Sequence, residues 1–403
     1  MAEETTIELK RAALNHYFQN LNTPQQQAVF HVNGPVLVLA GAGSGKTTAM
    51  IHRIVQMIHF GDGWVQANAS ITKEDAAYLK DYIADKQPAD LERLCSILAV
   101  QPIQPWHILA ITFTNKAANE LRSRLLQAIG EECASMLHAS TFHSACVRIL
   151  RRSISKLGYD SNFTIYDTDD SQRLMKSCIA DADVSEKQFP PRAVLTEISL
   201  AKDRMCSPEY FCIEAGSDYR KMVIGKLYKE YQNRLKSANA LDFDDLIYKT
   251  VELLESFPEE LEYYQNRFRY IMVDEYQDTN HAQFRLVQLL SQKHQNLCVV
   301  GDDDQSIYRF RGATIENILN FEKQFQNAVV IRLEQNYRST KTILEAANDV
   351  IAHNAGRKEK TLWTDLEDGK KIIWYKAVDE TDESRFVAEK IAKEVQNGAS
   401  YQD

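Results

Sequence analysis

A glycine-rich loop followed by a lysine and a threonine could bind the phosphates of a nucleotide. Residues 40–47 read Ala-Gly-Ala-Gly-Ser-Gly-Lys-Thr and follow an apolar run over 35–40. Glycines let backbone amides curl around phosphate oxygens because no Cβ obstructs them. Lys46 would place a charge at the β- and γ-phosphates, and the hydroxyl of Thr47 would bind Mg²⁺. A flexible glycine turn without a ligand is the weaker interpretation. The predicted ATP-binding residues here are Ala40, Gly41, Ala42, Gly43, Ser44, Gly45, Lys46, Thr47 and Thr48.

An acidic pair at the end of an apolar run could bind the metal and orient the attacking water. Residues 271–278 read Ile-Met-Val-Asp-Glu-Tyr-Gln-Asp. Asp274 could hold Mg²⁺ through water, and Glu275 could orient the attacking water. A solvated acidic turn is the alternative, but the upstream phosphate loop favours the catalytic interpretation. The Asn-Lys pair at 115–116 resembles the start of a guanine-specific NKxD motif, but Ala118 lacks the base-reading carboxylate.

These residues must be positioned by strands that end at one edge of a sheet. Short apolar runs alternate with amphipathic helical patterns, which is typical of a parallel sheet covered on both faces. Helices are expected over 46–60, after residue 115 and over 340–352. The predicted strands are 35–40, 107–112, 270–273, 297–300 and 329–333.

Two stretches interrupt this alternation and divide the chain. Residues from about 61 to 105 are polar and helical in pattern, with three prolines, and are interpreted as an insertion. Residues 141–265 contain few strand candidates, so we predict a helical domain inserted into the α/β one. The predicted domains are a first α/β domain over 1–140 and 266–335, the inserted helical domain, and the start of a second α/β domain over 336–403.

The composition argues against several classes of protein. The seven cysteines form no Cys-x-x-Cys pair, which argues against a zinc ribbon, an iron–sulfur cluster or a disulfide framework. No stretch approaches the roughly 18–20 apolar residues of a membrane span, and the charged N-terminus has no signal-peptide core. We therefore expect a cytoplasmic protein without a membrane partner. The net charge of −9 means that nucleic acid would need a local groove. Arginines at 148, 151 and 152 could line one or be a solvated helix face.

Eight sequence blocks resemble, in order, those of superfamily 1 DNA helicases of the UvrD/Rep/PcrA type. They are LNTPQQQAV, AGAGSGKT, TFTNKAA, TFH, LDFDDL, VDEYQDT, VVGDDDQSIYRFRGA and RLEQNYRST, and they extend from Leu21 to Thr340. Each block alone is a weak or moderate signal, whereas eight in the same order are specific. The resemblance implies a RecA-like P-loop NTPase fold.

The resemblance implies further roles at the nucleotide. Gln25 would bind the adenine edge, because a primary amide both donates and accepts. Arg53 would complete the base site, and Tyr337 would stack on the ring. Gln305 would sense the γ-phosphate, and Arg338 would act as an arginine finger, typically worth about 10³–10⁵ in rate. The implied catalytic residues are Lys46, Asp274, Glu275, Gln305 and Arg338, with ATP and Mg²⁺ as ligands.

The resemblance also implies a single-stranded DNA path. Aromatic residues suit a motor that must tolerate any sequence, because every base offers a face for stacking. Phe310 stands where close relatives generally carry Trp, which leaves less stacking area and no indole donor. Phe113 and Phe243 could instead be plain core residues, and His143 a structural hydrogen-bonding residue. The implied DNA contacts are Phe113, Thr114, Asn115, Thr141, Phe142, His143, Phe243, Tyr308, Phe310 and Arg311.

The function implied by this resemblance is a 3′-to-5′ ATP-dependent helicase that acts on single-stranded DNA and on junctions of single- and double-stranded DNA. Repair or replication proteins are possible partners. Residues 341–403 match only the opening of the second motor domain. We therefore expect a truncated chain that binds ATP and DNA but is weakly active or inactive by itself. Two alternatives remain: a regulatory module that binds nucleotide and DNA without turnover, and the helicase part of a helicase–nuclease.

Overall fold

A six-stranded parallel sheet forms the centre of the molecule. The computed structural model describes residues 2–66, 71–307, 312–354 and 357–402. The strand order is β3-β2-β6-β7-β1-β8, and all the pairs in this sheet are parallel. Its strands are β1 (Val36–Ala40), β2 (Ile108–Thr112), β3 (His138–Thr141), β6 (Tyr270–Val273), β7 (Leu297–Gly301) and β8 (Val329–Leu333). The predicted α/β class with a parallel sheet is confirmed, and so are the five predicted strands.

Successive residues of each strand face two different hydrophobic cores. In β1, Val36 and Val38 belong to one core, whereas Leu37 and Leu39 belong to the other. Both faces are thus fully covered, which explains why the strands read as continuous apolar runs and not as alternating ones. β3 was not predicted, because its sequence His-Ala-Ser-Thr carries little apolar signal.

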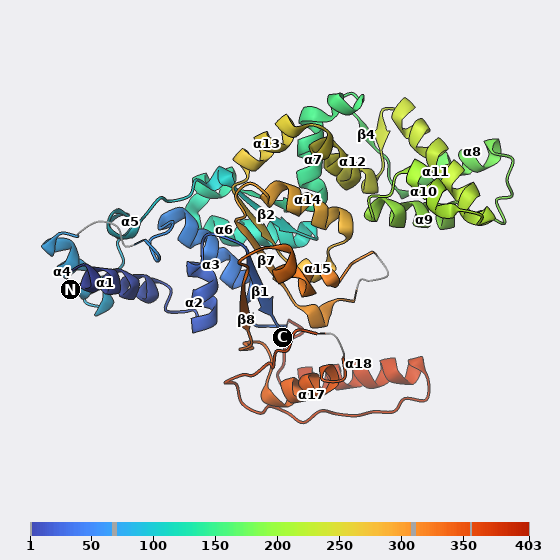
Figure 1. The fold of residues 1–403 in the computed structure, drawn as a ribbon. Helices are drawn as coiled ribbons and strands as arrows, with labels where there is room; N and C mark the ends of the chain where they lie inside the picture. Colours follow the sequence, from blue (N-terminus) through green and yellow to red (C-terminus); the bar gives the residue numbers. More distant parts are fainter. Residues whose placement is uncertain (1, 67–70, 308–311, 355–356, 403) are drawn as a thin grey trace.

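Helices cover the two faces of the sheet as separate layers (Figure 1). The first core is shared with α1 (Ala2–Tyr17), α2 (Thr23–Phe30), α3 (Lys46–His59), α4 (Lys73–Ile83), α5 (Leu91–Leu98) and α6 (Asn115–Met136). The second core is shared with α7 (Phe142–Ser153), α12 (Phe243–Ser256), α13 (Pro258–Arg267), α14 (His281–Ser291), α15 (Glu316–Leu319) and α16 (Phe321–Gln324). The predicted insertion at about 61–105 contributes α4 and α5, which lie beside α1.

A third core lies away from the sheet. It is formed by α8 (Thr168–Asp181), α9 (Pro191–Asp203), α10 (Pro208–Ala215) and α11 (Tyr219–Ser237). A two-stranded parallel ladder of β4 (Thr164–Ile165) and β5 (Ala240–Leu241) connects this helical group to the rest. The predicted helical stretch 141–265 is therefore divided, because α7, α12 and α13 pack on the sheet instead. The exact domain boundaries stay a prediction.

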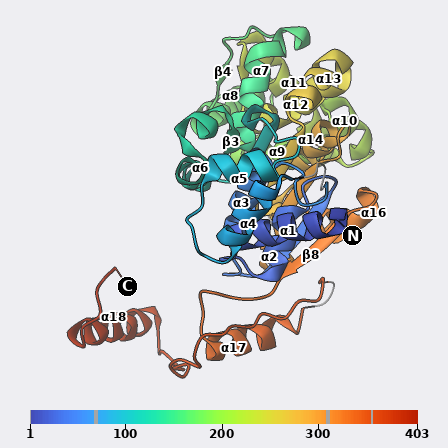
Figure 2. The ribbon, with the colours of Figure 1, turned by 90° about the vertical axis from the view of Figure 1, so that its left-hand side faces the viewer.

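The last part of the chain packs more loosely than the rest. α17 (Lys341–Ile351) and α18 (Glu380–Gln396) lie below the sheet and its covering helices in both views (Figures 1 and 2). α18 has no buried residue. The segment around Leu362, by contrast, returns to the sheet, where Trp363 exchanges backbone hydrogen bonds with Glu334 and Asn336. No helix within the described residues is long and apolar enough to cross a membrane.

Candidate nucleotide and DNA site

The phosphate loop connects the end of β1 to the start of α3. Gly45 precedes the helix with a left-handed backbone (φ 81°), and no side chain of the described residues caps the helix N-terminus. The first amides of a helix have no partner within the helix, and they carry the positive end of its dipole. Uncapped amides that follow three glycines are therefore suited to an anion such as a nucleotide phosphate.

Two glycines of the loop permit close approach by the later part of the chain. A Cβ built on Gly41 would lie 2.1 Å from Cδ2 of Leu362, and one on Gly43 would lie 2.7 Å from Nδ2 of Asn336. Asn336 also donates to the carbonyl of Ala42 at 2.6 Å. The residues next to Arg338 are therefore held against the phosphate loop, as an arginine finger would need. Sequence reasoning missed Asn336, although it lies inside the RLEQNYRST block.

Lys46 meets the acidic pair across the end of the sheet. Its Nζ lies 3.0 Å from Oε2 of Glu275, which also accepts from Nε2 of Gln277 at 2.9 Å. Glu275 has a left-handed backbone (φ 48°), which is uncommon for a residue with a Cβ and occurs often at functional sites. Burial, together with the neighbouring Glu275 carboxylate, raises the pKa of Asp274 to about 6. A cation placed beside Asp274 would relieve both effects.

Gln305 belongs to a network that reaches the last part of the chain. Its amide donates to Asp302 at 2.5 Å, and Nζ of Lys360 lies 2.8 Å from the other oxygen of that carboxylate. Lys360 also contacts Asp303 at 2.5 Å and Asp304 at 2.6 Å. Lys360 was not predicted as part of the site. The acidic triplet was a visible signal that some cation must neutralise it.

Gln25 and Tyr337, predicted for the base site, are linked through Asn22. Gln25 donates to the carbonyl of Ser44 at 3.0 Å, and Asn22 donates to the hydroxyl of Tyr337 at 2.9 Å. The Tyr337 side chain is 50% exposed, so its ring is available for stacking. Arg53 lies differently, because its buried guanidinium donates to the carbonyls of Ala28, His31 and Val32 at the end of α2. The structure thus gives Arg53 a structural role, and its predicted contact with the base stays a prediction.

The predicted DNA residues of two blocks follow neighbouring strands. Phe113, Thr114 and Asn115 come after β2, and Thr141 ends β3, which pairs with β2. Thr114 and Thr141 each cap the following helix by accepting a backbone N–H. Carboxyl ends of parallel strands share one edge, so these residues lie on the same edge as the phosphate loop. Tyr308, Phe310 and Arg311 lie outside the described residues.

The aromatic candidates differ in exposure. Phe142 is buried, and its ring centroid lies 5.5 Å from that of the half-buried Phe113. A direct base contact by Phe142 would therefore require it to leave the core. Phe243 is 57% exposed, and its centroid lies 5.0 Å from that of His143. Burial lowers the pKa of His143, which keeps the ring neutral at physiological pH.

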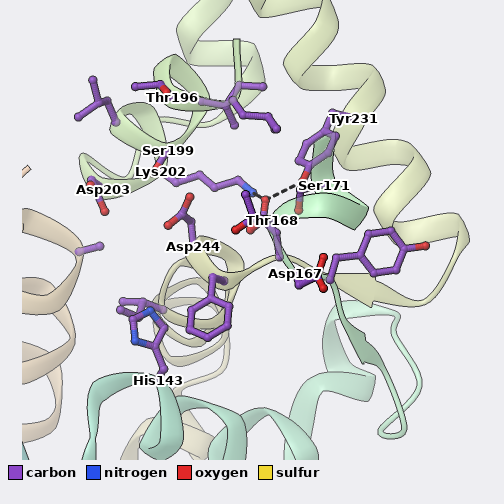
Figure 3. A pocket seen from close by; sticks show the side chains of 18 of the residues that line it. His143, Asp167, Thr168, Ser171, Thr196, Ser199, Lys202, Asp203, Tyr231 and Asp244 are labelled. Atoms are coloured by element: carbon purple, nitrogen blue, oxygen red, sulfur yellow. Dashed lines mark hydrogen bonds and ion pairs between the residues drawn. The ribbon is translucent and has the colours of Figure 1, made fainter. Parts of the chain in front are cut away.

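Phe243 and His143 line a pocket of about 550 Å³ between the helical group and the helices α7, α12 and α14 (Figure 3). Lys202 also lines this pocket. Its Nζ lies 2.7 Å from Asp242 and 3.0 Å from Asp245. Burial alone would lower the pKa of Lys202, but the two carboxylates outweigh it and raise the pKa. Asp203, at the end of α9, accepts from Asn280 at 2.5 Å and thereby connects the helical group to α14.

Comparison with known families adds an independent observation to this geometry. A family model described as the UvrD/REP helicase N-terminal domain matches residues 21–68 and 91–326, which is more than half of the chain. The chain belongs to the UvrD/REP helicase family. A model of the UvrD-like helicase C-terminal domain matches residues 331–403. The gap in the UvrD/REP match, at 69–90, falls inside the predicted insertion and contains α4.

Curated relatives agree with this membership of the UvrD/REP helicase family. The chain is 46% identical over 97% of its length to the ATP-dependent DNA helicase PcrA of Staphylococcus aureus (strain Mu50 / ATCC 700699), covering 47% of that relative. It is 45% identical over 97% of its length to the protein of the same name from Staphylococcus epidermidis (strain ATCC 12228 / FDA PCI 1200), covering 48% of it. The chain thus spans about half the length of the curated relatives it matches.

Proposed function

We propose that the protein is an ATP-dependent DNA helicase, and that this chain carries its phosphate site and part of its path for single-stranded DNA. The observation that carries the proposal is the placement of both candidate sites at one edge of the sheet. The phosphate loop follows β1, the acidic pair follows β6 and the DNA candidates follow β2 and β3. A rearrangement at the nucleotide can then be transmitted to the DNA through a single rigid sheet.

The hydrolysis step assigns one task to each polar group. Lys46 and the amides that start α3 would hold the β- and γ-phosphates. Glu275 would release its hydrogen bond from Lys46 and orient a water toward the γ-phosphate. Arg338, held near the loop by Asn336, would stabilise the charge that develops on the transferred phosphoryl group.

The donor set fits Mg²⁺ as the metal that accompanies ATP. Thr47 offers a hydroxyl at the start of α3, and Asp274 offers a half-buried carboxylate whose pKa is raised by burial and by the neighbouring Glu275 carboxylate. Oxygen ligands of this kind are preferred by Mg²⁺, which usually keeps several waters as well. Bound Mg²⁺ would neutralise charge on the phosphates.

Coupling to DNA would pass through Gln305, which follows β7, and through the ends of β2 and β3. Gln305 lies in the segment that joins β7 to the predicted contacts at 308–311, so one short stretch would touch both ligands. Phe243 and His143 extend this path into the pocket of Figure 3. We propose single-stranded DNA and its junctions with duplex as the substrates, with 3′-to-5′ movement as in the proteins that the eight blocks resemble.

We further propose that the helical stretch 141–265 and the stretch 336–403 act as separate domains around the first α/β domain. The separate core of α8–α11 and the loose packing of α18 support this division. On this proposal, residues 336–403 would contribute Tyr337 and Arg338 to the ATP site.

Steady-state ATP hydrolysis with and without single-stranded DNA tests the proposal. Glu275→Gln should lower DNA-stimulated turnover by about 10²–10⁴-fold, the usual contribution of a group that activates the nucleophile. Glu92→Gln removes an exposed carboxylate on α5 and serves as the matched control. Equal turnover in wild type and Glu275→Gln would contradict the assignment. ATP binding without turnover, with or without DNA, would fit both an incomplete motor and the regulatory module.

A further inference from the structure

A smaller pocket lies near the opposite end of the strands from the nucleotide site. Its volume is about 210 Å³, far more than the roughly 10–15 Å³ that one ordered water needs. It is bounded by residues of β2 and β3, by α7 and by the end of α13. The polar groups in its wall come from His138, Ser140, Arg148, Arg267 and two tyrosines.

Two arginines of this pocket approach the same imidazole. Nη1 of Arg148 lies 3.2 Å from Nδ1 of His138, and Nη2 of Arg267 lies 3.0 Å from its Nε2. A guanidinium only donates hydrogen bonds, and a neutral imidazole has a single acceptor nitrogen. Burial and the two arginines lower the pKa of His138 to about 4, so the ring is neutral at physiological pH. One of the two arginines therefore points a donor at an N–H group, and that donor has no acceptor among the described residues.

The pocket contains two cations without an acid. Within the described residues, neither Arg148 nor Arg267 has a carboxylate within ion-pairing distance. Arg152, one turn later on α7, by contrast lies 3.8 Å from Glu260. The hydroxyl of Ser140 is buried, lines the same pocket and has no hydrogen-bond partner among the described residues. A buried polar group without a partner is rare in a folded protein and indicates an absent partner, such as water or an ion.

We propose that this pocket is a binding site for a phosphate-class oxyanion, which accepts hydrogen bonds from Arg148, Arg267 and the hydroxyl of Ser140. Arginine is suited to this task because its planar fork matches two oxygens of such an anion, and because its charge-assisted hydrogen bonds are strong. The anion would give the unmatched arginine donor an acceptor and offset the charge of the two guanidinium groups. The site does not depend on the helicase assignment, because none of its residues is among the nucleotide or DNA contacts that the family resemblance implies.

Titration with inorganic phosphate, followed by calorimetry, tests the site directly. The parent for all variants is Lys46→Ala, so that the phosphate loop contributes little to the signal. Arg267→Gln should weaken phosphate binding by about tenfold or more, the size expected for one charge-assisted hydrogen bond. Arg151→Gln is the matched control, because Arg151 lies on α7, the helix that carries Arg148, with its guanidinium over the ring of Phe163. It removes the same charge outside the pocket and should change the affinity less than twofold.

Ser140→Ala separates binding from folding. Its hydroxyl has no hydrogen-bond partner in the part of the chain that the structure describes. Its removal should therefore leave thermal stability unchanged or slightly raised while weakening phosphate binding. Equal phosphate affinity in the parent, Arg267→Gln and Ser140→Ala would overturn the proposal. The absence of saturable phosphate binding in the parent would also overturn it.

A DNA arm identifies the source of the anion. If a backbone phosphate occupies the pocket, Arg267→Gln should reduce the salt dependence of oligonucleotide binding by about one unit of the logarithmic slope. If the anion is free phosphate, that slope should stay unchanged while phosphate binding is lost. Both results support an oxyanion site, and the slope decides which anion fills it in the presence of DNA.

Discussion

Two lysines of this molecule contact carboxylates at almost the same distance but in different surroundings. Nζ of Lys46 lies 3.0 Å from Glu275, and Nζ of Lys202 lies 2.7 Å from Asp242. The Glu275 side chain is 39% exposed, and it is the only carboxylate paired with Lys46 among the described residues. Lys202 is buried with a second carboxylate, that of Asp245, which is 0% exposed.

The difference shows that distance alone does not distinguish a binding site from a structural cluster. The charge of Lys202 is compensated by two buried carboxylates, so its ammonium group is not available to bind an anionic ligand. Lys46 shares one partly exposed acid and lies beside uncapped helix amides, so an incoming phosphate can replace Glu275. We therefore expect substitutions at Lys202 to affect folding, and those at Lys46 to affect ligand binding.

The largest expected effect is on stability, at Lys202. Lys202→Met leaves Asp242 and Asp245 buried without a cation, and breaking a buried pair in this way typically costs about 3–5 kcal/mol. Chemical denaturation should therefore show a loss of that size in the free energy of unfolding. Lys46→Met should cost less than about 1 kcal/mol, since a partly exposed pair contributes little. Similar losses for the two variants would remove the distinction between the clusters.

The ionisation of Asp274 in the nucleotide site should make the free energy of unfolding depend on pH. The pKa of Asp274 is raised from 3.8 to about 6 in the folded state. As the pH rises from about 4 to 6, the unfolded carboxyl ionises first, so the folded state loses stability over that window. Asp274→Asn should abolish this loss and gain up to about 3 kcal/mol above pH 6 in the absence of Mg²⁺. Denaturation curves at pH 4 and pH 7 measure the difference. If the variant changed the free energy of unfolding equally at both pH values, the pKa of Asp274 would not be raised in the folded state.

A smaller effect is expected on DNA affinity at Phe243, on the open side of the Lys202 cluster. Phe243→Ala should weaken single-stranded DNA binding by about 1–3 kcal/mol, the usual value of one stacked base. The free energy of unfolding of Phe243→Ala should differ little from that of the wild type, because the ring is largely exposed. Fluorescence anisotropy with a labelled oligonucleotide measures the loss. Unchanged affinity would place the DNA path elsewhere and leave the pocket with a structural role only.

Much of the fold followed from local pattern, because buried parallel strands are short apolar runs that end in recognisable turns. The phosphate loop and the acidic pair were also visible, since glycines and carboxylates at fixed spacing have few other uses. Other features depend on distant parts of the chain. The buried state of Phe142, the carbonyl contacts of Arg53 and the contacts of Lys360 with the acidic triplet all follow from tertiary packing, which no local pattern reports.

Ligand-induced thermal stabilisation tests the central claim most directly. A ligand at about 100 times its dissociation constant stabilises the folded state by about 2.7 kcal/mol. We predict that Mg·ADP raises the Tm of the wild-type chain, and that Lys46→Ala has nearly the same Tm without ligand but loses this rise. A retained rise in Lys46→Ala, or a fall in its ligand-free Tm as large as that of Lys202→Met, would contradict the account.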